Sequence, residues 1–336
     1  MRKEASLEQW RSLYEVASKI KLMRPWKFLW DMDLITISLP KYKEHFFCSV
    51  MGRAGECVAI GTYVGYDAIH DFYRIANCKD IPPEQIMRYQ NNMMCYFGNR
   101  DELTKNELQL IKDLGLKFRG KNEWIYFQSF KTGYVPYILD SQEVTELTLV
   151  FQQLFMAIRA MIEMKVRIEF DDGNTLFRSY DDKDKLWYTH QVPIVIPPKR
   201  YMTPVIKDDL LFAKLNKQKA IKDEIELDTL YLNAVITDEK FERPILPKLL
   251  ILADVKSERL IDKKMLSPED NEVMEILDIV INYIFKAGKP KTIYVRDEYI
   301  ESTLLDLCKR TNIRLKVKGG LRAIDTFARA FSEHKF

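Results

Sequence analysis

Several features that mark specialised protein classes are scarce in this sequence of 336 residues. With 12 glycines and 13 prolines, it is not a low-complexity chain. Its five cysteines form no C-x-x-C pair, and its four histidines lack the spacing of zinc ligands. No apolar run reaches the roughly 18 residues of a membrane span, and the N-terminal stretch has no apolar signal region. These absences predict a reduced, cytoplasmic protein.

The charges of the chain nearly cancel. There are 52 basic and 49 acidic side chains, a formal net charge of +3. Such a balance gives no global field to attract nucleic acid or membrane, so a nucleic-acid site would have to be a local patch. Hydrophobic residues make up 47% of the chain and aromatic residues 12%, which is ample for packed cores. The length favours two domains over one.

A proline-rich segment divides the chain. The stretch QVPIVIPPKRYMTP (191–204) holds four of the 13 prolines, and we predict a linker over 191–206. Residues 1–190 are then the first domain and 207–336 the second.

The first domain is predicted to be α+β with an antiparallel sheet. Strand-like runs at 45–52 and 57–65 flank a glycine-containing turn and predict a hairpin. Thr104 and Glu107 have the spacing of a capping box at the start of a helix. A long helix with a 3.6-residue apolar period is predicted after Ser141. The polar residues 171–185 predict a solvated loop or hairpin.

The second domain is predicted to follow the order β-β-β-α-β-α-β-α. Its first helix is expected to start with Ser267 as N-cap and to end at Gly288. The predicted strands cover 229–237, 248–254, 259–266, 292–297 and 313–317. This order resembles the ribonuclease H-like fold, which implies an α/β domain but carries no function by itself.

Nucleases of that fold gather carboxylates around two Mg²⁺ ions. The acids available here at strand ends or in the last helix are Asp238, Asp254, Asp297 and Asp325, of which Asp254 and Asp297 are the best candidate metal ligands. Glu275 has suitable spacing, but its helical phase turns it toward water. No acid is therefore well placed as the third ligand of such a metal site. We favour a non-catalytic protein, and the alternative is a Mg²⁺-dependent nuclease that uses Asp254, Asp297 and either Asp238 or Asp325.

The stretch LKFRGKNEWIYFQSFKTGYVPYIL (116–139) interleaves cations with aromatic rings and allows two interpretations. In a nucleic-acid surface, the cations would contact phosphates and the rings would stack on bases. In a half-buried hairpin, the rings would fill the core, and we favour this because both faces of the strand are apolar. The binding candidates are Lys117, Arg119, Lys121, Trp124, Tyr126, Lys131 and Tyr134.

Other reactive side chains have ordinary interpretations. Cys48, Cys57, Cys78 and Cys95 lie in apolar runs and are predicted to be buried thiols. His70 next to Asp71 is too little to predict a catalytic pair.

Several segments together resemble a bacterial two-domain family whose domains carry only labels of unknown function. They are PW, SVMGRAGE, the 115–139 stretch, RPILPKLLILAD and KPKTIYVRDE. Where that family has Trp-Pro and Pro-Gly-Tyr, this chain has Trp124-Ile125 and Thr132-Gly133-Tyr134. The resemblance implies a bacterial cytoplasmic protein with this domain pair and brings no activity or cofactor. We therefore predict a partner-binding protein, the partner being a protein or a nucleic acid, without a cofactor; Mg²⁺ enters only in the nuclease alternative.

Overall fold

A computed structural model describes residues 2–77 and 81–333. The chain separates into two compact units. The first contains Met1–Ile81 and Arg88–Lys199, and the second contains Pro82–Met87 and Arg200–Phe336. Each unit is built around its own sheet. Among the described residues, no helix combines the length and apolar character that a bilayer crossing demands.

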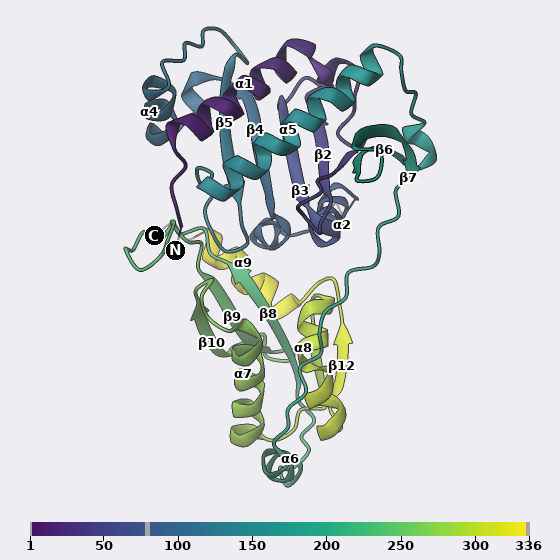
Figure 1. Cartoon of the computed structure of the whole chain (residues 1–336). Helices are drawn as coiled ribbons and strands as arrows, with labels where there is room; N and C mark the ends of the chain where they lie inside the picture. The colour runs from purple at the N-terminus through teal and green to yellow at the C-terminus, as the bar shows by residue number, and fades with distance from the viewer. Residues whose placement is uncertain (1, 78–80, 334–336) are drawn as a thin grey trace. The chain divides into compact units, whose positions relative to one another are not determined.

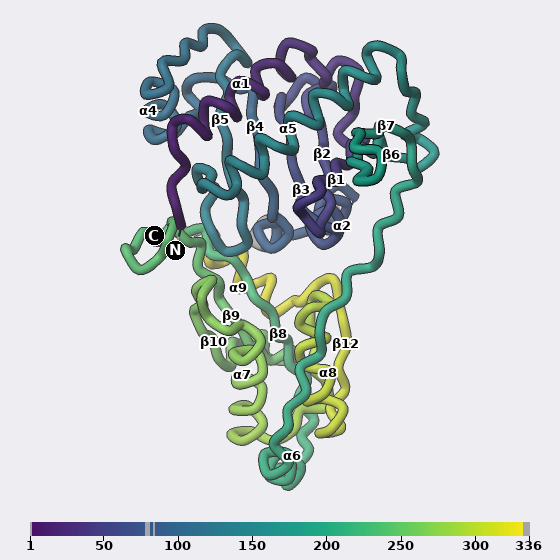
Figure 2. The backbone as a smooth tube through the Cα atoms, viewed as in Figure 1, coloured from purple at the N-terminus to yellow at the C-terminus, as the bar shows by residue number. Residues whose placement is uncertain are grey.

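The first unit holds a seven-stranded sheet of order β5-β4-β3-β2-β1-β6-β7 (Figure 1). Its strands are β1 (Ile35–Ser38), β2 (Phe46–Met51), β3 (Ala59–Val64), β4 (Asn92–Gly98), β5 (Trp124–Phe130), β6 (Asn174–Asp181) and β7 (Leu186–Pro193). The predicted hairpin is the antiparallel pair β2–β3. The sheet is antiparallel as predicted except at one pair, because β1 pairs with β6 in parallel. Figure 2 shows β1 between β2 and β6.

Two long helices cover one face of this sheet (Figure 1). They are α1 (Leu7–Met23) and α5 (Ser141–Ile162), and each begins with a capping box, at Ser6 and at Asp140. Their apolar stripes meet the inward side chains of the strands, for example Phe151 and Phe127. The other face packs α2 (Gly65–Asn77) against residues such as Phe47 and Tyr63.

Short elements complete this part of the chain. They are α4 (Lys105–Asp113), which has the predicted Thr104–Glu107 capping box, and the 3-10 turns η1 (Pro25–Lys27), η2 (Met87–Tyr89), η3 (Arg100–Glu102) and η4 (Phe170–Asp172). The residues predicted as a loop or hairpin at 171–185 contain all of β6 and the turn that leads to β7. β7 runs on to Pro193, so the first three residues of the predicted linker belong to a strand.

The second unit holds a five-stranded sheet of order β10-β9-β8-β11-β12. Its strands are β8 (Glu224–Tyr231), β9 (Lys248–Asp254), β10 (Leu260–Leu266), β11 (Thr292–Val295) and β12 (Arg314–Val317). β8 pairs with β9 antiparallel and with β11 in parallel, and β11 pairs with β12 in parallel. β10 is antiparallel to β9.

Helices lie on both faces of this sheet. One face packs against α6 (Asp209–Asn216), α7 (Glu272–Ala287) and α8 (Glu298–Thr311). The opposite face packs against α9 (Arg322–Glu333), through Leu321, Ile324 and Ala328. The short helix α3 (Pro83–Ile86) also groups with this unit. The second unit is therefore a three-layer α/β domain.

Two predicted boundaries in the second unit are wrong for local reasons. β8 begins at Glu224 and ends at Tyr231, whereas we predicted a strand over 229–237. Two of the acids that precede the predicted strand, Glu226 and Asp228, are buried in β8. Helix α7 begins after Asn271 and not after Ser267, because Ser267 donates its backbone N–H and its hydroxyl to the carboxylate of Asp270 and forms a turn.

Candidate functional site

The aromatic strand β5 is part of the core. Ile125, Tyr126 and Phe127 are buried, and the ring of Phe127 lies edge-on to Tyr14, with 5.1 Å between centroids. Trp124 and Tyr134 are half-buried. β5 pairs along its whole length with β4, and the following segment contributes only the isolated bridge Ser129–Tyr137. The predicted hairpin of β5 with the segment that follows it is therefore wrong, and the partner of β5 is β4.

Lys131, the cation at the end of β5, is already paired. Its Nζ lies 2.8 Å from Oε1 of Glu143, a carboxylate that also accepts a hydrogen bond from Ser129. Burial raises the pKa of Glu143, but the hydrogen bonds from Lys131, the Asp140 backbone and Ser129 outweigh it and leave the pKa below its ordinary value. Lys131 is thus engaged inside the unit.

The remaining cations of this stretch lie on the surface. Lys117, Arg119 and Lys121 are exposed in the loop between α4 and β5. Gly120 has a φ of +113°, a backbone conformation that favours glycine and keeps the loop tightly turned. The structure thus separates the predicted binding residues into three exposed cations and four side chains that pack within the unit.

The same loop contributes to the wall of a hollow of about 400 Å³, which we call the basic hollow. Its lining comes from the end of α1, from η1 and from the loop before β5: Ser18, Lys21, Leu22, Arg24, Trp26, Lys27, Val58, Phe118, Asn122, Glu123 and Ile125. Glu123 is the single acid in this lining, and it forms an ion pair with Lys21. Trp26 and Phe118 form the aromatic part of the wall and are half-buried.

Two further cations of the lining, Arg24 and Lys27, and the three exposed cations of the adjoining loop have no ion-pair partner among the described residues. Within the described ranges 2–77 and 81–333, no ion pair involves Arg24, Lys27, Lys117, Arg119 or Lys121, and all five are exposed. Arg24 and Lys27 follow the C-terminal end of α1, where the helix dipole favours positive charge. Lys117 and Arg119 flank the lining residue Phe118 in the sequence. The hollow therefore combines unneutralised positive charge with aromatic surface.

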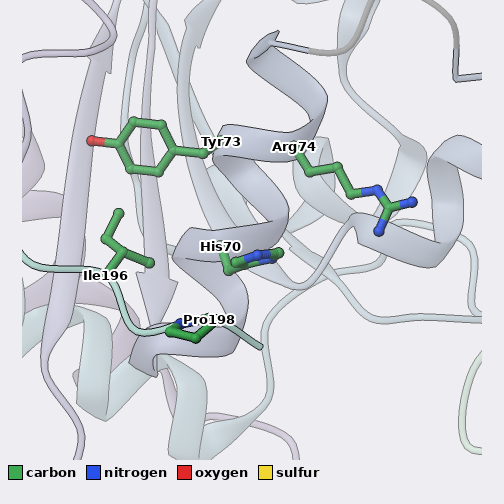
Figure 3. A pocket seen from close by; sticks show the side chains of 5 residues that line it. All are labelled: His70, Tyr73, Arg74, Ile196 and Pro198. Atoms are coloured by element: carbon green, nitrogen blue, oxygen red, sulfur yellow. The ribbon is translucent and has the colours of Figure 1, made fainter. Parts of the chain in front are cut away.

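A second hollow, of about 460 Å³, lies beside α2 (Figure 3). His70, Tyr73 and Arg74 come from α2, and Ile196 and Pro198 from the segment after β7. Arg74 stacks on the ring of Tyr89 at 4.6 Å, so its charge is partly engaged.

Behind this hollow, Asp71 is buried and its Oδ2 accepts a 2.7 Å hydrogen bond from Lys199. Burial raises the pKa of Asp71, an effect only partly offset by Lys199. The Nδ1 atom of His70 lies 3.9 Å from Oδ1 of Asp71, too far for a hydrogen bond. The ion pair fastens the segment after β7 to α2, which is a structural role.

The acids proposed for a metal centre have separate local tasks. Asp297 caps α8 by accepting from the backbone N–H of Ile300. Asp254 ends β9 and accepts from the N–H of Ser257, and Asp238 accepts from that of Lys240. Glu275 pairs with Lys264. Across the described part of the chain, no group of three or more His, Cys, Asp or Glu side chains is placed to hold a metal ion.

Asp325 belongs to a different, largely buried cluster. Arg296 donates through Nε to Oδ2 of Asp228 at 2.6 Å, through Nη2 to Oδ1 of Asp325, and through Nη1 to the carbonyl of Gly319 at 2.7 Å. Asp228 has no exposed surface. Gln85 of α3 also donates to Oδ2 of Asp228, at 3.2 Å, and to the carbonyl of Thr229 at 2.8 Å. We call Asp228, Arg296 and Asp325 the carboxylate–arginine cluster.

Two family matches agree with this division of the chain. Residues 10–178, half of the chain, match the family described as Domain of unknown function (DUF7309). The protein belongs to the DUF7309 family. Residues 211–332 match a second description, Domain of unknown function (DUF6930). The two matches bear out the predicted pair of domains with labels of unknown function. No curated protein matches the sequence.

The central acids of the second unit were not among the predicted site residues. Glu226 and Asp228 stand two residues apart on β8 and share one face of the strand. Glu226 accepts from the backbone N–H groups of Ala323 and Ile324 at the start of α9. The alternation Glu-Ile-Glu-Leu-Asp is the signal that would have found this strand, since its apolar residues recur with period two.

Sequence analysis also misplaced one thiol of the DUF7309 domain. Cys57 is exposed, not buried, because it lies in the turn between β2 and β3 and not in a strand. Cys48 and Cys95 are buried as predicted. Cys78 lies outside the described residues.

Proposed function

We propose that this protein is a non-catalytic, single-strand nucleic-acid-binding protein and that the basic hollow of the DUF7309 domain is its binding site. The observation that carries the proposal is a hollow with an aromatic wall whose lining includes two exposed cations without ion-pair partners in the described part of the chain, Arg24 and Lys27. Three further exposed cations, Lys117, Arg119 and Lys121, lie in the loop that supplies part of this lining. We also propose, from the resemblance of the sequence, that the protein acts in the bacterial cytoplasm.

The chemistry of this hollow suits a single strand better than a duplex. The exposed cations of the lining and of the adjoining loop would contact phosphates, and each contact releases condensed counterions. The half-buried rings of Trp26 and Phe118 offer apolar surface to unpaired bases, which a duplex keeps stacked. A volume of about 400 Å³ is within the range of sites for small ligands and admits a nucleotide-sized group.

We further propose a ribonuclease H-like architecture for the DUF6930 domain. Support comes from the order β10-β9-β8-β11-β12, in which β9 alone is antiparallel to both of its neighbours and β8, β11 and β12 are parallel. The non-catalytic part of the proposal is supported by the carboxylates: Asp254 and Asp297 bind backbone N–H groups, and Asp325 binds Arg296. These residues do not fit a two-metal centre, which needs several shared carboxylates facing one another.

Binding can be measured by fluorescence anisotropy with labelled single-stranded DNA and RNA over a range of salt concentrations. We expect the affinity to fall steeply with salt. The double variant Arg24→Glu/Lys27→Glu should lose on the order of tenfold or more in affinity and should show a smaller salt slope, because two phosphate contacts are removed.

A matched control is Lys214→Glu/Lys286→Glu. This variant changes the net charge by the same amount as Arg24→Glu/Lys27→Glu. The two exposed lysines lie in the last turns of α6 and α7, so their replacement also removes positive charge from helix C-termini, where the helix dipole favours it. It should bind as the unmodified protein does. Equal affinity of both double variants would refute the proposed site. Mg²⁺-dependent cleavage that disappears in both Asp254→Asn and Asp297→Asn would instead establish the nuclease alternative.

A further inference from the structure

The guanidinium of Arg296 stands at the centre of three oxygen acceptors from separate parts of the second unit. Asp228 comes from β8, Gly319 from the loop after β12, and Asp325 from α9. The Arg296 side chain is 8% exposed, that of Asp228 0% and that of Asp325 31%. The cluster is thus closed on the Asp228 side and reaches solvent on the Asp325 side.

Two buried or half-buried carboxylates held together require a cation. Without a positive charge between them, the two carboxylates would repel each other. Arginine stays protonated at any ordinary pH, so its charge is permanent, and its planar fork reaches both carboxylates at once. The oxygens that a metal ion would need are occupied: Oδ2 of Asp228 accepts from Arg296 and Gln85, and Oδ2 of Asp325 accepts from the N–H of Leu321.

We infer that Arg296 is the built-in cation of a carboxylate centre, and that its removal opens a binding site for one divalent metal ion. The guanidinium neutralises Asp228 and Asp325 in the way that a metal ion would, and it prevents a metal ion from binding while it is present. This inference does not depend on nucleic-acid binding by the first unit.

The ligands that remain without Arg296 define the class of ion. Two carboxylates and the carbonyl of Gly319 are hard oxygen donors, which suit Ca²⁺, Mg²⁺ and Mn²⁺. A Cβ added at Gly319 would meet no atom within 4 Å, so this part of the loop is not closely packed. The partial exposure of Asp325 gives the ion a route into the site and leaves room for water ligands.

The test uses the full-length Arg296→Ala variant and thermal unfolding followed by far-UV circular dichroism, in Mn²⁺ and in EDTA. We expect the melting temperature of the unmodified protein to be the same in both. The variant should melt at a lower temperature in EDTA and should recover part of the loss in Mn²⁺. Titration of the variant with Mn²⁺, followed by the electron paramagnetic resonance of the free ion, should show one bound ion per chain.

Two variants separate this result from a general loss of stability. Arg310→Ala removes an arginine that stacks on Phe212 and pairs with the exposed Asp209, so it should melt equally in Mn²⁺ and EDTA. Asp228→Asn/Arg296→Ala removes the buried carboxylate as well, so it should fold and should not respond to Mn²⁺.

Three results would overturn the inference. The first is a folded Arg296→Ala variant with the same melting temperature in Mn²⁺ and EDTA. The second is an unmodified protein that Mn²⁺ stabilises through Asp228, as shown by loss of the effect in Asp228→Asn. The third is an Arg296→Ala variant that stays unfolded even in Mn²⁺ while the double variant folds, since a metal ion then cannot replace the guanidinium.

Discussion

Cations near the two sheets have opposite surroundings. In the first unit, Arg24 and Lys27 are exposed beside a hollow and no acid in the described part of the chain neutralises them. In the second unit, Arg296 is buried and donates to three acceptors at once. A buried charge must be satisfied within the protein, whereas an exposed one is solvated by water and is available to a partner. This difference is why we propose binding by the first unit, while the cluster around Arg296 stabilises the second.

The largest expected effect tests the claim of internal order. Asp228→Ala leaves the buried guanidinium of Arg296 without its main partner and should lower the free energy of unfolding of the second unit by about 3–5 kcal/mol. All five tryptophans lie in the first unit, at 10, 26, 30, 124 and 187. The loss should therefore appear in urea unfolding followed by circular dichroism and not in tryptophan fluorescence.

Glu275→Ala is the control for Asp228→Ala, because it breaks a solvent-exposed ion pair with Lys264 in the same unit. It should change the unfolding free energy far less. If the two variants were equally stable, the carboxylate–arginine cluster would contribute no more than a surface pair, and the contrast between the units would fail.

A loss of stability of intermediate size is expected from a substitution at Gly288, where two backbone segments of the second unit lie close together. Gly288, at the end of α7, has a φ of +116°, and an added Cβ would lie 2.7 Å from the carbonyl oxygen of Lys219. Gly288→Ala should cost about 1–3 kcal/mol from backbone strain alone, and the overlap adds to it. Circular dichroism during urea unfolding measures the loss.

Gly173 in the first unit is the control for Gly288, because it has a positive φ without close neighbours. It has a φ of +74°, but an added Cβ would meet nothing within 4 Å. Gly173→Ala should therefore cost only the left-handed conformation, about 1–2 kcal/mol, and tryptophan fluorescence should report it. A larger loss for Gly173→Ala than for Gly288→Ala would contradict the tighter packing that we assign to the second unit at this position.

The smallest expected effects concern pH and have opposite signs in the two units. The pKa of Glu143 is lowered in the folded first unit, so its contribution is present above the ordinary value of 4.5 and is lost as pH falls through the folded pKa. Burial raises the pKa of Glu226 in the second unit, despite the N–H groups of α9. The folded state then binds more protons than the unfolded state, and stability is lost as pH rises from 4.5 through the folded pKa.

Glutamine variants separate these two contributions. Relative to the unmodified protein, Glu143→Gln should destabilise the first unit at neutral pH, and Glu226→Gln should stabilise the second. Both differences should shrink toward acidic pH, where the carboxyl groups are protonated. Urea unfolding at a series of pH values, with fluorescence for the first unit and circular dichroism for both, measures this. The same sign for both variants would show that one of the two assignments is wrong.

The sequence predicted correctly those helices and strands whose own residues have the pattern that is typical of the element they form. β9 spans the predicted 248–254, because KLLILAD is apolar nearly throughout and lies inside the sheet. The Thr104–Glu107 capping box was predicted because its two side chains are three residues apart in the sequence. β8 was misplaced because its acids are compensated by Arg296, Gln85 and the start of α9, which are distant in sequence.

The candidate site was predictable only in part. Lys117, Arg119 and Lys121 were named from the sequence and are exposed. Arg24 and Lys27 were not named, because they come from a turn about 90 residues earlier. They line one hollow with Phe118 only because α1 packs beside the loop that contains Phe118. Spacing along the chain carries no information about such a convergence.

The parallel pairing of β1 with β6 has a consequence for synthesis on the ribosome. Thr36 on β1 and Thr175 on β6, whose hydroxyls lie 2.8 Å apart, are separated by 139 residues. At about 5–20 residues per second, translation takes roughly 7–28 s to cover that distance. During this time β2 has been made but β6 has not, so one edge of β1 has no partner strand and is a template for incorrect pairing with other chains. Slower translation lengthens the time during which this edge is exposed, and higher expression increases the number of chains that expose it. We expect both to increase aggregation of the nascent protein.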